Sequence, residues 1–320
     1  MMDRLLIVIP TLNEEAHIAA VLQSLVAEAP ADAKVVVSDG GSIDNTRCIV
    51  AGFPRVTLLN NPQKLQGAGI NRAVETLGQD CTVLLRADAH ATYPAGFIQA
   101  LLDELHATEA DSVTVPMRTL GPTPFTEAVA AAQNSVLGTG GSAHRTGKGG
   151  RFVDHGHHAL MRLSAFRSVG GYDPAQSHNE DAELDYRLRA AGHTIWLTDK
   201  TCIGYVPRST FSALFHQYFK HGKGRATTAQ KHNMRLKLRQ IAPLLVLSSL
   251  VLAAIGLGLS LIDPMWMMLT IPTAAWAVVC LILGAALAIK ARRLPMLLSG
   301  PAAMVMHIGW GLGFLTAARQ

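Results

Sequence analysis

Short apolar runs alternate with helix-patterned segments along the first part of the chain. Between the runs, apolar residues recur every three or four positions, which predicts helices packed by one face. Unbroken runs of branched aliphatic residues are typical of strands buried on both faces. The predicted strands are Leu5–Ile9, Lys34–Ser38, Val56–Leu59, Cys81–Leu85 and Ser112–Pro116, and the main helices between them are Glu14–Glu28, Gln66–Leu77 and Pro94–His106. This alternation predicts an α/β fold with a mainly parallel sheet, helices on both faces and right-handed crossovers.

The regular alternation ends after Pro116. Gly138–Gly150 is rich in glycine and predicts a loop, and Phe152–Leu163 predicts a strand facing the site. A helix is expected at Asp181–Ala191, followed by a strand at Thr194–Leu197. Phe211–Lys223 has an amphipathic pattern with several aromatic residues, which predicts a helix at a membrane interface.

The last part of the chain is apolar and nearly free of acidic residues. Residues 241–262, 265–289 and 294–318 are each long enough to cross a bilayer, for which about 20 residues suffice. The third segment contains Pro301 and His307, so a re-entrant path is the alternative to a full span. We therefore expect a domain at residues 1–235 and a membrane domain at 236–320.

The formal net charge of +5 changes this picture little. The basic residues cluster before the first apolar segment and again at Lys290–Arg293, so lipid headgroups are a better partner for them than nucleic acid. No aromatic residues interleave these clusters as base-stacking platforms would. By the positive-inside rule, the first domain and the Lys290–Arg293 loop are expected on the cytoplasmic face of the inner membrane.

Acidic residues follow the ends of several predicted elements. Asp39 follows one strand, Asp88 follows another, and Glu180 with Asp181 opens a helix. Open α/β sheets bind ligands beyond the carboxyl ends of their strands. The pattern therefore predicts that a nucleotide, a metal ion and a catalytic base meet in one crevice.

Four segments in this order carry a family resemblance. They are Ile9-Pro10-Thr11-Leu12-Asn13-Glu14-Glu15, Asp39-Gly40-Gly41-Ser42-Ile43-Asp44-Asn45-Thr46, Asp88-Ala89-His90 and Glu180-Asp181. Over roughly residues 5–225 the sequence resembles the family 2 glycosyltransferases of the GT-A fold. Arg86-Ala87-Asp88-Ala89-His90-Ala91 and the Gly222-Lys223-Gly224-Arg225 ending further resemble the branch that makes succinoglycan.

The resemblance implies a nucleotide-binding set drawn from three segments. In this set Asp39 would bind the base, and a carboxylate there can accept a bond from an imide N–H or a ribose hydroxyl. Helix capping by Asn13, Glu14 or Asp39 is the structural alternative. The implied residues are Pro10, Thr11, Asn13, Glu14, Asp39, Gly40, Asn71, Arg86, Ala87 and Asp88.

Asp88-Ala89-His90 stands where the family carries an acidic D-x-D motif that binds metal. Alternation along an extended chain would put Asp88 and His90 on one side, where both could bind Mn²⁺ or Mg²⁺. Imidazole suits Mn²⁺ better than Mg²⁺, so the histidine leaves the identity of the ion open. His90 could instead contact a phosphate or the sugar.

Glu180 and Asp181 open a predicted helix, and a helix N-terminus favours the ionised carboxylate. The resemblance implies that Asp181 is the base that deprotonates the acceptor and that Glu180 supports it. Helix capping is again the alternative reading.

Further residues are expected near the diphosphate or the acceptor, namely Gln217, Lys223, Arg225 and Asp154. The family's Q-x-x-R-W motif is absent, and a membrane-surface role competes for these cations. His155, His157 and His158 alternate across a strand, which disfavours a zinc site made of all three.

Together these features predict a metal-dependent inverting glycosyltransferase. The expected donor is a nucleotide sugar, UDP-glucose, and the expected acceptor is a lipid-linked sugar at the membrane. Two alternatives stay open, a polyprenyl-phosphate glycosyltransferase and a catalytically silent nucleotide-sugar-binding subunit of an export complex.

Overall fold

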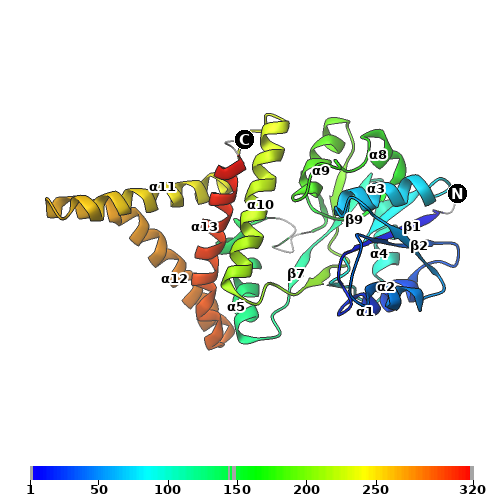
Figure 1. The fold of residues 1–320 in the computed structure, drawn as a ribbon, viewed down its shortest axis with the longest axis horizontal. Helices are drawn as coiled ribbons and strands as arrows, with labels where there is room; N and C mark the ends of the chain where they lie inside the picture. Colours follow the sequence, from blue (N-terminus) through cyan, green and yellow to red (C-terminus); the bar gives the residue numbers. More distant parts are fainter. Residues whose placement is uncertain (1–2, 143–144, 146–148, 318–320) are drawn as a thin grey trace. The chain divides into compact units, whose positions relative to one another are not determined.

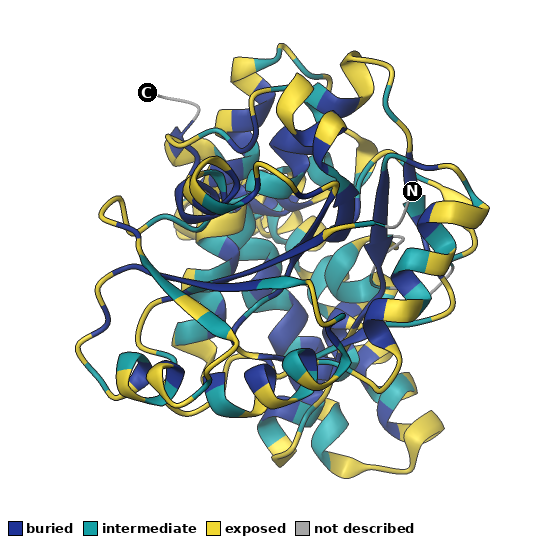
Figure 2. Ribbon diagram, turned by 90° about the vertical axis from the view of Figure 1, so that its right-hand side faces the viewer, coloured by how far each residue is buried: buried dark blue, intermediate teal, exposed yellow. Residues whose placement is uncertain are grey.

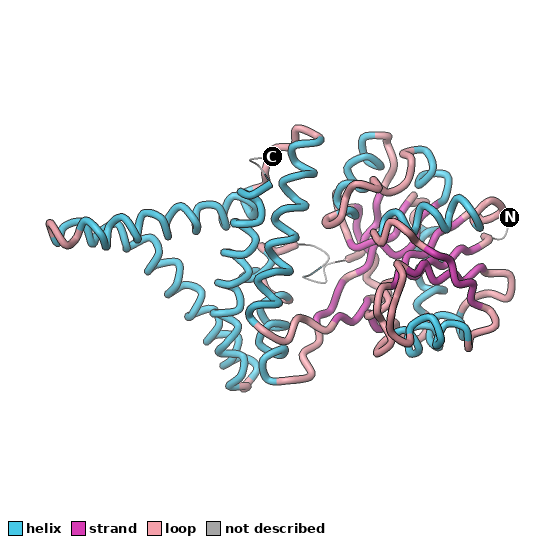
Figure 3. The backbone as a smooth tube through the Cα atoms, in the orientation of Figure 1, coloured by secondary structure: helices cyan, strands magenta, loops and turns pink. Residues whose placement is uncertain are grey.

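The computed structural model describes residues 3–142, 145 and 149–317. Contacts between residues divide the chain into two compact units. The first unit comprises residues 1–118 and 147–205, and the second comprises residues 119–146 and 206–320. Strands belong mainly to the first unit, whereas the second unit is almost entirely helical (Figure 1, Figure 3).

The first unit is built on an eight-stranded sheet in the order β3-β2-β1-β4-β9-β6-β10-β8. Strands β1, β2, β3 and β4 are parallel, β6 and β10 are parallel, and β9 runs antiparallel to both of its neighbours. A small second sheet has the order β5-β11-β7. The strands are β1 Leu5–Thr11, β2 Lys34–Asp39, β3 Val56–Asn60, β4 Val83–Arg86, β5 Ala91–Thr92, β6 Ser112–Val115, β7 Met117–Thr119, β8 Arg151–Phe152, β9 His157–Arg162, β10 Ile195–Leu197 and β11 Ile203–Tyr205.

Side chains that alternate along the strands form two apolar layers. Leu5, Ile7 and Ile9 of β1 pack with α1 and α4, whereas Leu6 and Val8 pack with α3, α8 and α9. The central strands are consequently buried on both faces, and the helices keep their outer sides exposed (Figure 2). The helices of this unit are α1 Ile18–Glu28, α2 Thr46–Ala51, α3 Gln66–Leu77, α4 Phe97–Ala107, α8 Leu163–Ser168 and α9 Glu180–Ala190.

The second unit contains short and long helices. A hydrophobic cluster joins α5, α10 and α13. The helices of this unit are α5 Pro124–Gln133, α6 Val136–Thr139, α10 Phe211–Lys231, α11 Leu238–Leu259, α12 Ile271–Ala291 and α13 Ser299–Ala317, with 3-10 helices η1 Pro264–Thr270 and η2 Leu294–Leu298. Within the part of the chain that the structure describes, three segments are long and apolar enough to cross a membrane, Leu238–Leu259, Pro264–Ala291 and Leu294–Ala317.

The mainly parallel α/β sheet with helices on both faces was predicted correctly. Two local differences stand out. The helix expected from Glu14 begins at Ile18; residues 15–17 before it form a turn, and the Glu14 and Glu15 N–H groups bond to side chains of the segment after β2. The single strand expected at Phe152–Leu163 is two strands, β8 and β9, which pair with different neighbours.

The predicted loop at Gly138–Gly150 is helical at its start, where α6 ends at Thr139. Residues 143–144 and 146–148 of that prediction lie outside the described residues. The domain boundary expected after residue 235 stays a prediction, because it concerns which residues enter a membrane rather than which residues pack together.

Candidate functional site

The carboxyl ends of β1, β2 and β4 lie at one edge of the sheet. Strand order runs outward from β1 through β2 to β3 on one side and continues through β4 on the other. Such a reversal leaves a crevice beyond the strand ends, where ligands bind in open α/β sheets. The fold therefore brings together the segments after residues 11, 39 and 86.

Asp39 lies at the end of β2 and is buried. Its carboxylate accepts bonds from the Gly41 N–H (3.1 Å) and from the Ser42 hydroxyl (2.5 Å), and it pairs with Arg47 at 3.0 Å. The Ser42 hydroxyl also accepts the Asn13 N–H at 2.8 Å. Two predicted nucleotide-binding segments are thus joined at one point.

The backbone at this edge also links β1 to β2. The Gly40 N–H donates to the Thr11 carbonyl at 2.8 Å. Within the described part of the chain, the buried Thr11 hydroxyl has no hydrogen-bond partner. A buried polar atom left unbonded costs free energy, so a ligand group is a reasonable partner for it. Thr11 lies among the residues predicted to bind the nucleotide.

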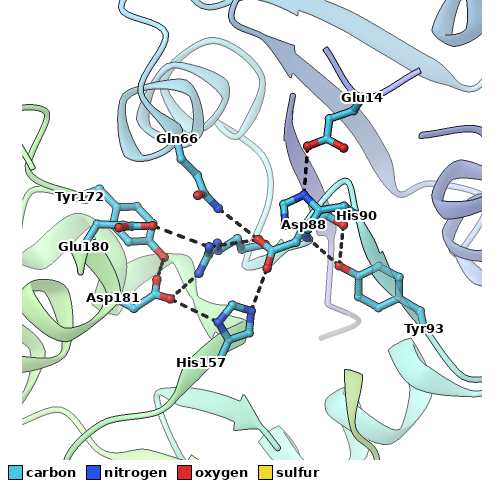
Figure 4. A network of polar contacts seen from close by, with 10 residues as sticks. Glu14, Gln66, Asp88, His90, Tyr93, His157, Tyr172, Glu180 and Asp181 are labelled. Carbon is cyan, nitrogen blue, oxygen red and sulfur yellow. Dashed lines mark hydrogen bonds and ion pairs between the residues drawn. The ribbon is translucent and has the colours of Figure 1, made fainter. Parts of the chain in front are cut away.

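The register between β4 and β9 explains why Asp88 faces a histidine. Leu85 is opposite Leu160 in this antiparallel pair. Continuing the register three residues beyond each places Asp88 opposite His157, and His157 Nε2 lies 3.1 Å from Asp88 Oδ2. The other imidazole nitrogen, Nδ1, lies 3.5 Å from Asp181 Oδ2. His157 therefore lies between two of the predicted functional carboxylates (Figure 4).

A buried arginine joins the same carboxylates from the other side. The Arg86 guanidinium lies 3.0 Å from Asp88 and 3.8 Å from Glu180, and its Nη1 donates to Asp181. The Arg86 side chain is 4% exposed, and each of the three carboxylates is 14% exposed. The Tyr172 hydroxyl adds a bond to Asp181 Oδ1 at 2.9 Å. We call Arg86, Asp88, His157, Glu180 and Asp181 the carboxylate cluster.

Burial and charge set the protonation of this cluster. Burial favours the neutral form of Asp88, but the Arg86 charge beside it overcomes that effect and lowers the pKa of Asp88 below its usual range. Burial and the neighbouring Asp181 charge raise the pKa of Glu180 to about 7. Burial works against the charge on Arg86, yet the surrounding acids hold its pKa well above the usual value. Asp88 and Arg86 are therefore ionised, and Glu180 titrates near neutral pH.

Two further contacts position the segment around Asp88. Gln66, at the start of α3, donates to Asp88 Oδ1 at 3.1 Å. The Tyr93 hydroxyl accepts the Asp88 N–H at 2.6 Å and donates to the Asp88 carbonyl at 3.1 Å (Figure 4). Burial and the Asp88 charge raise the pKa of Tyr93, so its hydroxyl keeps its proton.

His90 lies beside the first motif. Residues 89 and 90 form a turn rather than an extended chain, so simple alternation does not describe them. His90 Nδ1 lies 3.0 Å from Glu14 Oε1, and the His90 side chain is 43% exposed (Figure 4). The contact joins the first and third motifs, and a ligand role for His90 stays a prediction.

Several other predicted residues have different surroundings. Both ends of the Asn71 amide bond to the Tyr172 backbone, at 2.7 and 2.9 Å. Asn71 therefore holds the turn that carries Tyr172. Asp154 is exposed and lies 3.3 Å from Arg189. The remaining three, Gln217, Lys223 and Arg225, lie on α10 in the second unit.

Sequence reasoning missed four residues of this site. Three of them, His157, Tyr172 and Gln66, contact the carboxylates by side chain, and Tyr93 holds the Asp88 backbone. The sequence singles out His157 only as one of three histidines that are disfavoured as a zinc site, and it gives no signal for Tyr172. Their roles depend on strand register and on the packing of α9, which sequence spacing does not reveal.

Known proteins resemble this chain in sequence and in fold. The pattern of "Glycosyl transferase family 2" matches residues 6–170. The chain is 49% identical over 314 residues to the succinoglycan biosynthesis protein ExoA of Rhizobium meliloti (strain 1021), covering 97% of this chain and 93% of that protein.

Two solved structures have a similar fold. One is the mannosyltransferase PcManGT from Pyrobaculum calidifontis in complex with GDP-Man and Mn²⁺, with a TM-score of 0.57 and 17% identity, covering 96% of this chain and 88% of that one. The other is glucosyl-3-phosphoglycerate synthase from Mycobacterium tuberculosis, with a TM-score of 0.52 and 16% identity, covering 73% and 82%. These likenesses show the GT-A-like fold, and the sequence matches show that this chain is a glycosyltransferase belonging to glycosyltransferase family 2.

Proposed function

We propose that this chain is an inverting transferase that moves glucose from UDP-glucose to a lipid-linked sugar acceptor during exopolysaccharide synthesis. The observation that carries the proposal is the carboxylate cluster, which joins Asp88 at the end of β4 to Asp181 at the start of α9 through Arg86. The identity to a succinoglycan biosynthesis protein over nearly the whole chain supports the exopolysaccharide role.

The nucleotide would bind at the ends of β1 and β2. Asp39 is buried and already ordered by Ser42 and Arg47, so it is a preorganised acceptor for a base N–H or a ribose hydroxyl. The Thr11 hydroxyl offers a further bonding group. Solved GT-A neighbours bind GDP-Man in one case and UDP-Glc in the other, which supports a nucleotide diphosphate sugar here.

The cluster fits a divalent ion that takes only part of its ligands from protein. Three carboxylates surround one guanidinium, so the cluster holds excess negative charge when they are ionised. Among the residues that the structure describes, no group of three or more His, Cys, Asp or Glu side chains could hold a metal ion. Mg²⁺ and similar hard ions are commonly held by one or two carboxylates together with substrate phosphates and water. Asp88 would hold Mn²⁺ or Mg²⁺, with His90 as a second candidate, and the ion would neutralise charge on the leaving diphosphate.

Asp181 is the proposed base. Arg86 and Tyr172 fix its two oxygens, and the N-terminus of α9 favours its ionised form. Asp181 would take the proton of the acceptor hydroxyl as that oxygen bonds to the anomeric carbon and the bond to the diphosphate breaks. Glu180 would change the charge next to Asp181, because a pKa of about 7 lets Glu180 gain or lose its proton near neutral pH.

The acceptor proposal follows from the apolar helices. A chain with helices long enough to cross a membrane would have lipid-linked sugars within reach, which supports an acceptor of that class. We propose that residues 1–235 lie on the cytoplasmic side of the inner membrane, and that residues 236–320 form the membrane domain. Asp154, Gln217, Lys223 and Arg225 are proposed for the acceptor or the diphosphate.

The test is UDP release from a panel of nucleotide sugars by detergent-solubilised protein, with Mn²⁺ or Mg²⁺ and a membrane lipid extract. Release with one sugar that depends on both metal and lipid supports the proposal and identifies the donor. Release with bare polyprenyl phosphate in place of the extract would favour the polyprenyl-phosphate enzyme. Nucleotide binding without release from any sugar would favour a silent subunit.

A further inference from the structure

His157 has a side chain able to bind a metal ion, and it faces the carboxylate that is proposed to hold one. Its imidazole Nε2 lies 3.1 Å from Asp88 Oδ2, and the two side chains are 13% and 14% exposed. In an octahedral site with ion-to-ligand distances of about 2.1 Å, neighbouring ligands lie about 3.0 Å apart. The two atoms are therefore spaced as two ligands of one ion would be. A hydrogen bond has a similar length, so the surroundings of both groups have to be considered as well.

The two oxygens of Asp88 have different partners. Oδ1 accepts bonds from Arg86 Nη2 at 3.0 Å and from Gln66 Nε2 at 3.1 Å. Oδ2 faces the imidazole of His157 (Figure 4). Carboxylates that bind metals are commonly held by hydrogen bonds of this kind from the protein. Arg86 and Gln66 therefore fix the orientation of Asp88 and keep Oδ2 directed toward His157.

The second nitrogen of the imidazole also faces a carboxylate. His157 Nδ1 lies 3.5 Å from Asp181 Oδ2. Histidines that bind metals usually donate their other ring N–H to a carboxylate or a carbonyl, which fixes the tautomer and the orientation of the ring. With the hydrogen on Nδ1 directed toward Asp181, the lone pair of Nε2 is directed toward Asp88 Oδ2. His157 thus has the carboxylate partner that a metal-binding histidine requires.

The fold holds His157 more firmly than it holds His90. His157 is the first residue of β9, where it pairs with Val115 of β6. His90 lies on a turn, its side chain is 43% exposed, and its Nδ1 lies 3.0 Å from Glu14 Oε1. Ligands carried by strands are positioned more precisely than ligands carried by loops. Between the two histidines, His157 is the better placed to share an ion with Asp88.

We propose that His157 Nε2 is the second protein ligand of the divalent ion, together with Asp88 Oδ2, and that His157 takes the place of the second acid of the family's D-x-D motif. The imidazole would also link the ion to Asp181, the proposed base. A nitrogen ligand favours Mn²⁺ over Mg²⁺. Asp181→Asn keeps an oxygen that can accept the Nδ1–H bond, so this variant should still bind the ion. The inference rests on the divalent ion of the proposed function but not on the donor sugar or the acceptor.

The test is pulsed electron paramagnetic resonance of Mn²⁺ bound to the detergent-solubilised full chain with UDP or GDP. A nitrogen that binds Mn²⁺ directly modulates the electron spin echo, and ¹⁵N-labelled histidine changes that modulation while leaving the nucleotide unlabelled. The variants are His157→Ala, His90→Ala and, as a control, His106→Ala. His106 is 58% exposed and pairs with Asp3, before the start of β1 and away from the strand ends that form the site.

We expect the labelled wild-type chain to show one histidine nitrogen on Mn²⁺. His157→Ala should lose this signal, whereas His90→Ala and His106→Ala should keep it. The affinity for Mn²⁺ in the presence of UDP should fall at least about 10-fold in His157→Ala, since loss of a residue that merely supports a ligand already costs about 10-fold to 100-fold.

Three results would overturn the proposal. They are a signal lost in His90→Ala but kept in His157→Ala, bound Mn²⁺ without a histidine nitrogen in the wild-type chain, and a wild-type chain that binds no Mn²⁺ with either nucleotide. If His157→Ala does not fold, the labelled His90→Ala chain decides, because a histidine nitrogen that persists there supports His157 and its loss refutes it. A chain that binds Mn²⁺ through His157 but transfers no sugar would refute the proposed transfer and leave this inference standing.

Discussion

Replacing Arg86 is the most direct way to test the carboxylate cluster. Arg86→Met keeps a side chain of similar length but leaves Asp88, Glu180 and Asp181 without their shared cation. Arg86 is 4% exposed and lies within 4 Å of all three acids. At an effective dielectric constant of about 20, two unit charges 4 Å apart attract by about 4 kcal/mol. Removing one partner from a buried ion pair costs about 3 to 5 kcal/mol.

We therefore expect Arg86→Met to lower the unfolding free energy by about 3 to 5 kcal/mol at pH 8. For a domain of this size each kcal/mol lowers Tm by about 2 to 4 °C. The deficit should shrink toward pH 5.5, because protonation of the unpaired carboxylates relieves their repulsion. Arg4→Met is the matched control, since Arg4 pairs with Asp80 at the surface and exposed pairs contribute about 1 kcal/mol or less.

Activity should respond differently from stability. Arg86→Lys retains the charge but loses the planar fork that reaches Asp88 and Asp181 together. We expect it to recover much of the Tm while kcat falls about 100-fold, which corresponds to about 2.7 kcal/mol of transition-state stabilisation. The assay is UDP release at saturating donor beside thermal unfolding in the same detergent. A lysine variant with wild-type kcat, or a methionine variant as stable as Arg4→Met, would refute the positioning role of Arg86.

The other predictions concern the remaining site residues and the pair of helices α10 and α13. Asp88→Ala should weaken metal-dependent nucleotide binding, whereas Asp181→Asn should abolish transfer and leave binding nearly intact. Calorimetry with UDP and metal measures the binding, and the UDP-release assay measures the transfer. Equal loss of binding in both variants would contradict the assignment of Asp88 to metal binding and of Asp181 to catalysis. The pKa of Glu180 is raised to about 7 from a usual 4.5, so the folded state binds this proton more tightly and loses stability as pH rises from 4.5 through 7. Glu180→Gln should therefore raise the unfolding free energy by up to about 3 kcal/mol at pH 8.5, and raise Tm with it, and should leave both nearly unchanged at pH 4.5; a lower Tm at pH 8.5 would count against the charge argument. Gly313→Ala should lower Tm by several degrees because its Cβ meets backbone at 1.9 Å, whereas Gly258→Ala, with open space around it, should be neutral; equal melting of the two variants would argue against close packing of α13.

The order of the main strands and helices as far as β6 could be predicted from sequence because buried strands need apolar runs, whereas the short strands β5, β7 and β11 carry no such run and were not predicted. The carboxylates at the ends of β2 and β4 could be predicted for the same reason, since strand ends are visible in the sequence. The start of α1 was predicted too early: residues 15–17 form a turn, and the bonds of Glu14 and Glu15 to Thr46 and Asp44 are long-range contacts that leave no periodic signal in the sequence.

The contacts within the site depended on the tertiary structure. Asp88 meets His157 because β9 runs antiparallel beside β4 in one register, and a shift by one residue would turn the histidine to the other face. Arg86 looked like part of a nucleotide-binding strand end, and its pairing with Glu180 and Asp181 required α9 to be packed over the sheet.

For the helices of the second unit, too, the sequence determined one property and the tertiary structure another. Composition alone determined that three segments are apolar enough to cross a bilayer, because hydropathy is a property of each segment by itself. Which apolar surface meets lipid and which meets protein is a property of packing. That choice for α13 was decided by Gly222 and Gly313, whose missing side chains let the backbones of α10 and α13 touch.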